Sequence, residues 1–196
     1  MAKTYLFVDG TNLYAAQYEL FGPDKYLDFS IFIGEIEAKL KIGFDKIYFY
    51  ASFSPQPKKL TKKGKLYLKN EALFYRTVKS MNKVSFFKGY RSASSGKEKE
   101  VDVKLTADLI HLAHMNYYNE VFLITGDADF LQALFVVHSI KKKIYIICLE
   151  NKIMYKGIYR FPTYIIRLTN VVPKYRKTAL VSELVLKKDR ICKKIA

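Results

Sequence analysis

The chain has 196 residues, of which half are hydrophobic and 15% aromatic, and its formal net charge is +16. This length suits one domain with a sizeable core, and the composition excludes a disordered chain. The two cysteines, Cys148 and Cys192, exclude a disulfide framework and favour a reducing compartment. Because no apolar stretch approaches a membrane span, we expect a soluble, cytoplasmic protein.

The positive charge is concentrated near the C-terminus. Residues 1–140 hold 19 Lys and Arg against 15 Asp and Glu, whereas residues 141–196 hold 15 against 3. This asymmetry predicts a main domain over residues 1–150 and a basic extension over residues 151–196, packed on the domain or continuing it. A lysine-rich surface can simply keep a protein soluble, but the asymmetry favours a polyanionic partner such as nucleic acid.

Short apolar runs alternate with helical patterns along the chain, which predicts an α/β fold. The first run is apolar on both faces and is therefore expected at the centre of a sheet. The expected strands are Tyr5–Val8, Lys46–Ala51, Lys83–Lys88, Val121–Thr125, Ile144–Leu149 and Tyr164–Leu168. The expected helices are Thr11–Leu20, Phe29–Leu40, Leu60–Ser80, Val103–Met115 and Phe130–His138, with a further helical pattern in the tail from Lys174.

Aspartates follow or begin several of these elements. Asp9 follows the first strand, Asp127 and Asp129 follow the fourth, and Asp102 opens a helical pattern. Because Asp102 lies three residues before Leu105 on the apolar stripe of that pattern, we expect its side chain to point inward at the helix N-terminus. The carboxyl ends of parallel strands meet at one edge of a sheet, where binding sites gather. Carboxylates brought together there would repel one another unless a divalent cation lay among them. The pattern therefore predicts a site for a metal with oxygen ligands.

Three segments that carry these aspartates together resemble the NYN domain family, which is related to PIN-like nucleases and includes the LabA-like group. The segments are VDGTN, EVDVKLTAD and TGDADF, and the resemblance covers roughly residues 3–150. It implies a three-layer, Rossmann-like fold with a mainly parallel sheet. It also implies a Mg²⁺ or Mn²⁺ site and metal-dependent hydrolysis of phosphodiester bonds, most often in single-stranded or loop RNA.

The resemblance assigns the candidate site residues. Asp9, Asp102 and Asp127 are the expected metal ligands, whereas Asn12 would orient a water or a phosphate oxygen and Asp129 would bind the metal or position the water. Supporting roles fall to Gly10 and Gly126 at tight turns and to Thr125 as a hydroxyl donor. Relatives often have a small residue where this chain has Glu100, which is either a further ligand or a loop charge.

Each aspartate also has a purely structural interpretation. Asp9 and Asp102 can cap helices, and Asp127 can form an Asx turn. The joint occurrence of the three favours the site. Asp108 borders the buried face of its helix, and an outer carboxylate of the site and an ordinary helix charge are equally consistent with its position.

Lysines near the candidate site and in the third helical pattern are expected to contact RNA. They are Lys97, Lys99, Lys104, Lys62 and Lys63. The first competing hypothesis is an RNA-binding adaptor with a weak or inactive site. The second is a DNA-directed, structure-specific nuclease, which the chain's lack of additional helical DNA-binding segments disfavours. A homodimer through a sheet edge or the C-terminal segment is compatible with the sequence.

Overall fold

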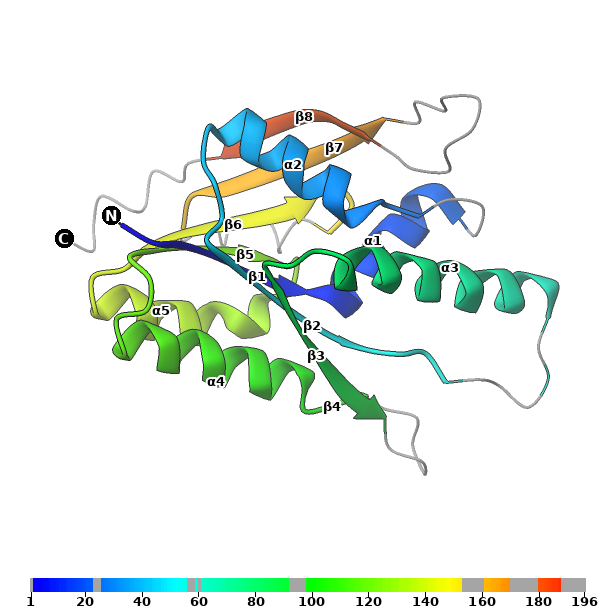
Figure 1. Cartoon of the computed structure of the whole chain (residues 1–196), viewed down its shortest axis with the longest axis horizontal. Helices are drawn as coiled ribbons and strands as arrows, with labels where there is room; N and C mark the ends of the chain where they lie inside the picture. Colours follow the sequence, from blue (N-terminus) through cyan, green and yellow to red (C-terminus); the bar gives the residue numbers. More distant parts are fainter. Residues whose placement is uncertain are drawn as a thin grey trace.

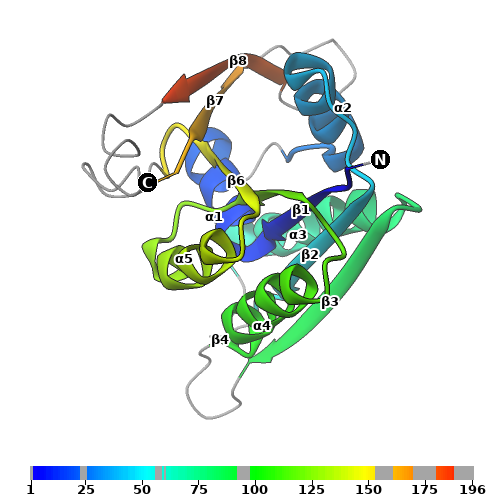
Figure 2. The same ribbon diagram turned by 90° about the vertical axis from the view of Figure 1, so that its left-hand side faces the viewer.

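One eight-stranded sheet with helices on both faces forms the molecule, which confirms the predicted three-layer α/β fold (Figure 1 and Figure 2). The computed structural model describes residues 2–22, 26–55, 59, 61–91, 98–152, 161–169 and 180–187. Helices α1, α2 and α3 cover one face of the sheet, and α4 and α5 cover the other.

Six strands of the sheet run parallel, and the two edge strands run antiparallel to their neighbours. The order is β4-β3-β2-β1-β5-β6-β7-β8, so that β1 lies among the central strands. The parallel strands are β1 (Thr4–Asp9), β2 (Lys46–Ser52), β3 (Val84–Arg91), β5 (Glu120–Ile124), β6 (Lys143–Leu149) and β7 (Thr163–Thr169). The edge strands are β4 (Glu98–Lys99) and β8 (Leu180–Lys187).

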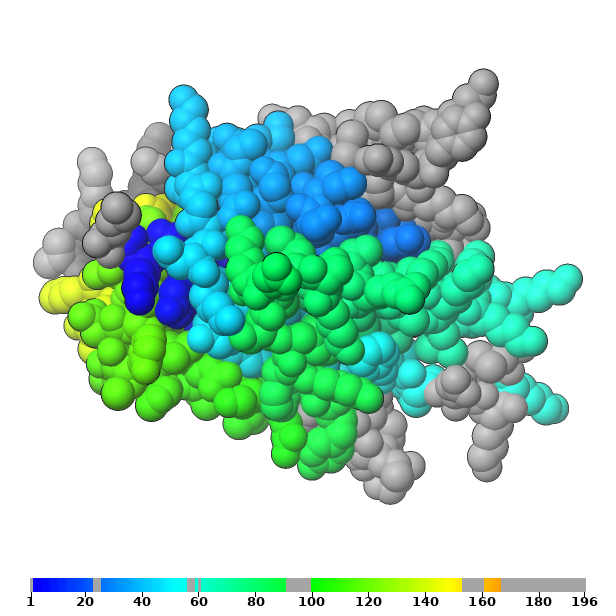
Figure 3. All heavy atoms as spheres, viewed as in Figure 1, coloured from blue at the N-terminus to red at the C-terminus, as the bar shows by residue number. Residues whose placement is uncertain are grey.

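The predicted helices are present with ends shifted by at most a few residues. They are α1 (Gly10–Phe21), α2 (Phe29–Leu40), α3 (Lys62–Lys79), α4 (Val101–His114) and α5 (Leu131–Ser139), with a short 3₁₀ helix, η2 (Ala128–Phe130), before the last. Side chains preceding α2 and α3 satisfy the free N–H groups of the first turns: Asp28 accepts from Ser30 and Ile31, and Thr61 accepts from Gly64. Figure 3 shows α2, α3 and β3 making up much of one outer face.

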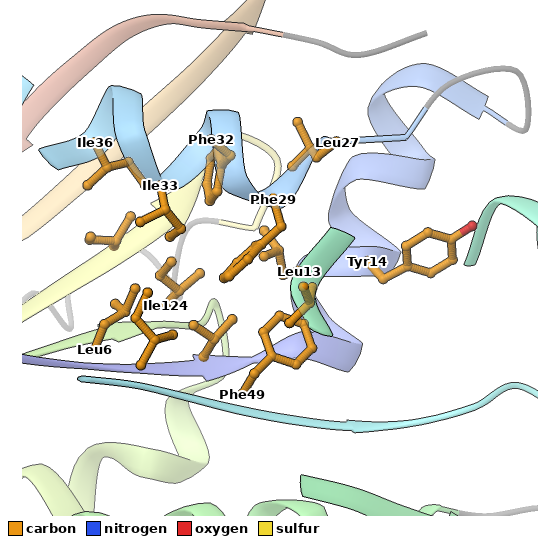
Figure 4. Close-up of a cluster of buried hydrophobic side chains, with 14 of the residues drawn as sticks. Leu6, Leu13, Tyr14, Leu27, Phe29, Phe32, Ile33, Ile36, Phe49 and Ile124 are labelled. Atoms are coloured by element: carbon orange, nitrogen blue, oxygen red, sulfur yellow. The ribbon is translucent and has the colours of Figure 1, made fainter. Parts of the chain in front are cut away.

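The alternation of side chains along β1 divides the core into two layers. Leu6 and Val8 belong to the cluster that packs under α1, α2 and α3, and Figure 4 shows Leu6 with Phe29, Ile33 and Phe49 of the same cluster. Tyr5 and Phe7 pack on the other face, against α4 and α5. Because both faces of β1 are buried, every residue from Tyr5 to Asp9 lies in the interior, as the apolar run predicts.

The prediction of a helix in the C-terminal tail is wrong over Leu180–Lys187, which forms strand β8 and pairs with β7. A short apolar run does not by itself distinguish a helix from a strand, and the unpaired edge of β7 provides the hydrogen-bond partners that decide for the strand. The domain boundary at residue 150 remains a prediction. In the described residues, no helix is long and apolar enough to cross a membrane.

Gly10 offers a test of the packing between β1, α1 and β2. A Cβ at this position would lie 2.1 Å from Cε1 of Phe49 and 2.9 Å from the carbonyl oxygen of Tyr50. We expect Gly10→Ala to lower the free energy of unfolding by about 1–3 kcal/mol, as overpacked cores do, measured by urea denaturation. Gly34→Ala is the matched control, since nothing lies within 4 Å of its added Cβ and the helix should gain about 0.5–1 kcal/mol. Equal stabilities for the two variants would contradict the tight packing.

Candidate functional site

The carboxyl ends of β1 and β5 lie side by side. These strands pair in parallel with Val8 opposite Ile124, so that Asp9 and Thr125, the next residue in each chain segment, are neighbours at the same edge of the sheet. The sequence predicts that these two strand ends meet only if the strands pair in parallel, and β1 and β5 do pair in parallel.

The carboxylate of Asp9 is buried and hydrogen-bonded at both oxygens. Its side chain belongs to a residue that is 5% exposed. Oδ1 accepts a hydrogen bond from the backbone N–H of Asn12 at 3.0 Å, which caps α1, and Oδ2 accepts from the hydroxyl of Thr125 at 3.0 Å. The cap role is therefore real, and the same side chain also joins helix α1 to the end of β5.

Further hydrogen bonds extend this connection to the loop after β5. The backbone N–H of Gly126 donates to Oδ1 of Asn12 at 3.1 Å, and that of Asp127 donates to the hydroxyl oxygen of Thr125 at 3.1 Å. Together, Asp9, Asn12, Thr125, Gly126 and Asp127 form one network, called here the β1–β5 cluster. It brings together five of the residues that the sequence assigns to the site.

Exposure increases outward through the β1–β5 cluster. Asp9 and Thr125 are buried, Asn12 and Asp127 are half-buried, and the neighbouring Asp129 is exposed. Asp127 forms the Asx turn that its structural interpretation requires, because its Oδ1 accepts from the backbone N–H of Asp129 at 3.0 Å. The cluster therefore presents an amide and a carboxylate at the protein surface, above a buried carboxylate.

Gly126 is required by a close approach of the chain. A Cβ at this residue would lie 2.1 Å from the carbonyl oxygen of Lys152. The loop after β6 thus presses directly on the loop after β5, and a side chain at residue 126 would push the two apart.

Helix α4 places Asp102 differently from the prediction. The residue was expected to point inward, but it is exposed in the first turn of α4. The buried stripe of the helix is Val101, Leu105 and Leu109, whose spacing of four puts Asp102 about 100° away from it. The preceding Glu100 is also exposed, and its left-handed backbone (φ 71°) is a conformation that glycine adopts without strain.

Asp108 joins α4 to β2. One carboxylate oxygen accepts from the hydroxyl of Tyr50 at 2.8 Å and the other accepts from Nζ of Lys104 at 2.6 Å. Burial, followed by the hydrogen bond to Asp108, raises the pKa of Tyr50 well above its ordinary value. Tyr50 was missed from the sequence. Pairing the ends of the first two predicted strands would have identified Tyr50, because the register of β1 and β2 puts Tyr50 opposite Asp9.

The lysines expected to bind RNA are spread over several elements. Lys62 and Lys63 are exposed in the first turn of α3, and Lys104 is exposed while paired with Asp108. Lys99 lies in β4, where its backbone pairs with that of Tyr90 in β3, and Lys97 lies outside the described residues.

The donor types of the β1–β5 cluster fit a hard divalent cation. The cluster offers carboxylates from Asp9 and Asp127 and an amide oxygen from Asn12, all oxygen donors of the kind that Mg²⁺ and Mn²⁺ prefer. Among the described residues, however, no group of three or more His, Cys, Asp or Glu side chains gathers closely enough to hold a metal ion. A cation bound here would therefore retain several waters or take oxygens from a substrate, as Mg²⁺ commonly does.

Thr125 tests the hydrogen bond to the buried carboxylate. We expect Thr125→Val to lower the free energy of unfolding by about 1.5–3 kcal/mol, the range for hydrogen bonds to charged groups. The matched control is Thr163→Val, at an equally buried residue (both 1% exposed) whose hydroxyl donates to the neutral carbonyl of Phe161. This control should lose only about 0.5–1.5 kcal/mol in the same urea denaturation. A smaller loss for Thr125→Val than for the control would contradict a charged acceptor.

Tyr50 predicts a pH dependence of stability. Its pKa is higher in the folded protein than in the unfolded chain, so its contribution is complete below pH 10 and is lost as the pH rises above that value. At pH 8, the free energy of unfolding of Tyr50→Phe should be about 1.5–3 kcal/mol lower than that of the wild type. Above pH 10 this difference should shrink, by up to about 1.4 kcal/mol per pH unit. The exposed Tyr117→Phe is the control, and a difference independent of pH would contradict the assignment.

Comparison with known proteins agrees with this fold. The family model described as the NYN domain matches residues 3–165. The crystal structure of a protein of unknown function from Vibrio parahaemolyticus is similar, with a TM-score of 0.60 and 16% sequence identity over 91% of this chain and 96% of that chain. No curated protein matches the sequence. The resemblance seen in the three aspartate segments is thus confirmed, and the chain belongs to the NYN domain family, whose domain has a nuclease-like fold.

Proposed function

We propose that the protein is a metal-dependent ribonuclease that hydrolyses phosphodiester bonds of single-stranded or loop RNA at the carboxyl edge of β1 and β5. The observation that carries the proposal is the β1–β5 cluster, in which hydrogen bonds bring Asp9, Asn12 and Asp127 together at one edge of a nuclease-like sheet. The family supports a nuclease, and the positive charge of the chain supports a polyanionic substrate.

The residues of the cluster would have different roles at the site. Asp9 and Asp127 would hold Mg²⁺ or Mn²⁺, with Asp102 as the third carboxylate from the exposed first turn of α4. Such a cation supplies a lowered pKa for bound water and charge compensation on phosphate oxygens. Asn12 adds an oxygen without adding negative charge, and its contact with Gly126 keeps it oriented. Thr125 fixes the carboxylate of Asp9, while Asp129 lies at the outer rim, where it can position a water.

Two observations favour the second candidate, an RNA-binding adaptor with a weak or inactive site. Both oxygens of Asp9 already accept hydrogen bonds within the protein, and the described carboxylates do not form a group of three. In an adaptor, the β1–β5 cluster would serve only to join α1 to β5, and RNA would be retained uncut.

Cleavage of an end-labelled single-stranded RNA with Mg²⁺ or Mn²⁺ separates the two candidates. Asp127→Asn keeps an acceptor for the N–H of Asp129 but removes the charge, so the fold should persist. We expect its cleavage rate to fall by about 100-fold or more, because even the outer partners of metal ligands are worth about 10–100-fold. EDTA should abolish cleavage by the wild type.

Asp45→Asn is the control for this measurement. Asp45 is exposed and accepts from the backbone N–H of Thr4, where β1 begins, at the opposite end of that strand from Asp9. Its substitution removes the same charge without touching the cluster and should leave the rate within about twofold of the wild type. RNA that is bound but left intact by the wild type in both metals would contradict the ribonuclease and support the adaptor.

A further inference from the structure

The exposed charges of helix α3 are all positive. Its 18 residues include six lysines and arginines and a single acid, Glu71. Glu71 is only 3% exposed, and its carboxylate accepts hydrogen bonds from the backbone N–H and the hydroxyl of Ser54. The acid therefore faces the interior and leaves the positive charges on the surface uncompensated along the helix.

Most of these cations lie along one side of α3. The helical spacing of three, four, seven and three residues keeps them within a single stripe, since each step is close to a whole number of turns. The stripe consists of Lys62, Lys65, Lys69, Arg76 and Lys79. At a rise of about 1.5 Å per residue, α3 spans about 27 Å, long enough for several successive phosphates of an extended strand.

Between the cations, the stripe is hollowed. Ala72 and Leu73 line a shallow hollow together with the flanking Lys69 and Arg76. The floor of this hollow is small and apolar, and its two ends are positively charged.

At its C-terminal end, the stripe meets aromatic side chains of the sheet. Nζ of Lys79 lies 4.5 Å from the ring centroid of Phe86 on β3 and 5.3 Å from that of Phe53, which follows β2. Nζ of Lys88, also on β3, lies 5.0 Å from the same Phe53 ring. In the described part of the chain neither lysine pairs with a carboxylate. Cation–π contacts thus hold two full positive charges in place and leave them available to an anion.

Tyr90 continues this surface along β3. It is two residues after Lys88, so the alternation of the strand puts both on the same face. Tyr90 is 56% exposed, which makes it the most exposed aromatic residue in the described part of the chain. Figure 3 shows α3 and β3 contributing to one continuous outer face.

We infer that this α3–β3 face, formed by the cationic stripe of α3 with Phe53, Lys88 and Tyr90, binds a single-stranded segment of RNA. The stripe matches the repeating charge of the backbone, and the exposed ring of Tyr90 offers a plane on which an unpaired base can stack. A duplex keeps its bases stacked internally and cannot use that ring. The inference rests on the proposed function in taking RNA as the ligand, and it extends the binding surface beyond the carboxyl edge of the sheet.

Fluorescence anisotropy with a labelled 20-nucleotide single-stranded RNA and the full chain, in EDTA so that the RNA stays intact, tests the inference. Lys79→Gln combined with Lys88→Gln should weaken binding by about 10-fold at 100 mM salt and reduce the salt slope by about 1.4, because each phosphate contact with a single strand contributes about 0.7. Tyr90→Ala should weaken binding about fivefold or more, whereas Tyr90→Phe, which retains the ring, should bind like the wild type.

Lys141→Gln combined with Lys143→Gln is the matched control. Both lysines are exposed and lie between α5 and the start of β6, and α5 covers the face of the sheet opposite α3. This pair removes the same charge and should weaken binding less than twofold. Equal losses for the two lysine pairs, or no effect of Tyr90→Ala, would overturn the inference.

The probe set separates single-stranded RNA from other partners of the same charge. The Tyr90→Ala loss should be confined to the single strand and absent for a duplex of the same sequence. Binding to anionic phospholipid vesicles that depends on Tyr90 and the lysine pair, in place of RNA binding, would overturn the inference in favour of a membrane surface. Because the assay measures binding without cleavage, a protein that binds RNA through this face but does not cleave it would support the inference and contradict only the proposed ribonuclease. Conversely, cleavage of RNA would not support the inference if binding were unaffected by the substitution of Lys79 and Lys88.

Discussion

The buried carboxylate of Asp9 is the interaction on which the carboxyl edge of the sheet depends. A charge in the interior is costly unless hydrogen bonds compensate for its lost hydration. The compensation comes from two directions, the first turn of α1 and the hydroxyl of Thr125, so burial of one charge fixes a helix against a strand that follows it by more than a hundred residues. The same bonds orient Asn12 and the loop that carries Asp127. Structural and chemical roles are combined in these side chains, and capping of α1 by Asp9 is compatible with the proposed site.

The sequence indicated the elements of the fold more reliably than the directions of individual side chains. The apolar run at residues 5–8 located the central strand because a strand covered on both faces has few alternatives. Asp102 was placed inward because it lies three residues before Leu105, yet the helix buries Val101, four residues before. A helical stripe admits both spacings, and only packing against the sheet decides between them. The C-terminal strand β8 had a similar ambiguity, which its neighbour β7 resolves.

Contacts between distant segments were the least accessible to prediction. In the sequence, Asp108 was equally consistent with a site residue and with a surface charge. Nothing in the pattern of its own helix indicates that its carboxylate accepts a hydrogen bond from the hydroxyl of Tyr50 on β2. Likewise, the lysines of the third helical pattern were visible as a basic run, but their union with Phe53 and β3 depends on how α3 lies on the sheet. The protein thus bears carboxylates at one edge and a row of cations on a neighbouring face. The positively charged side chains attract a polyanion, whereas carboxylates without a bound metal ion repel it. A divalent metal ion bound at the carboxyl edge would therefore change where on the surface the polyanion binds.

The position of β1 also has a consequence for how the chain acquires its structure. Strand β1 is synthesised before the other described strands and lies between β2 and β5, whose residues follow it by roughly forty and more than a hundred positions. Its Leu6 face is covered largely by α1, α2 and α3, all complete by residue 79, whereas its Phe7 face awaits α4 and α5. The two layers of the core therefore become available at different times during translation. Until the second arrives, the nascent chain exposes one apolar side of its central strand, the situation in which chaperones bind and partly folded chains associate.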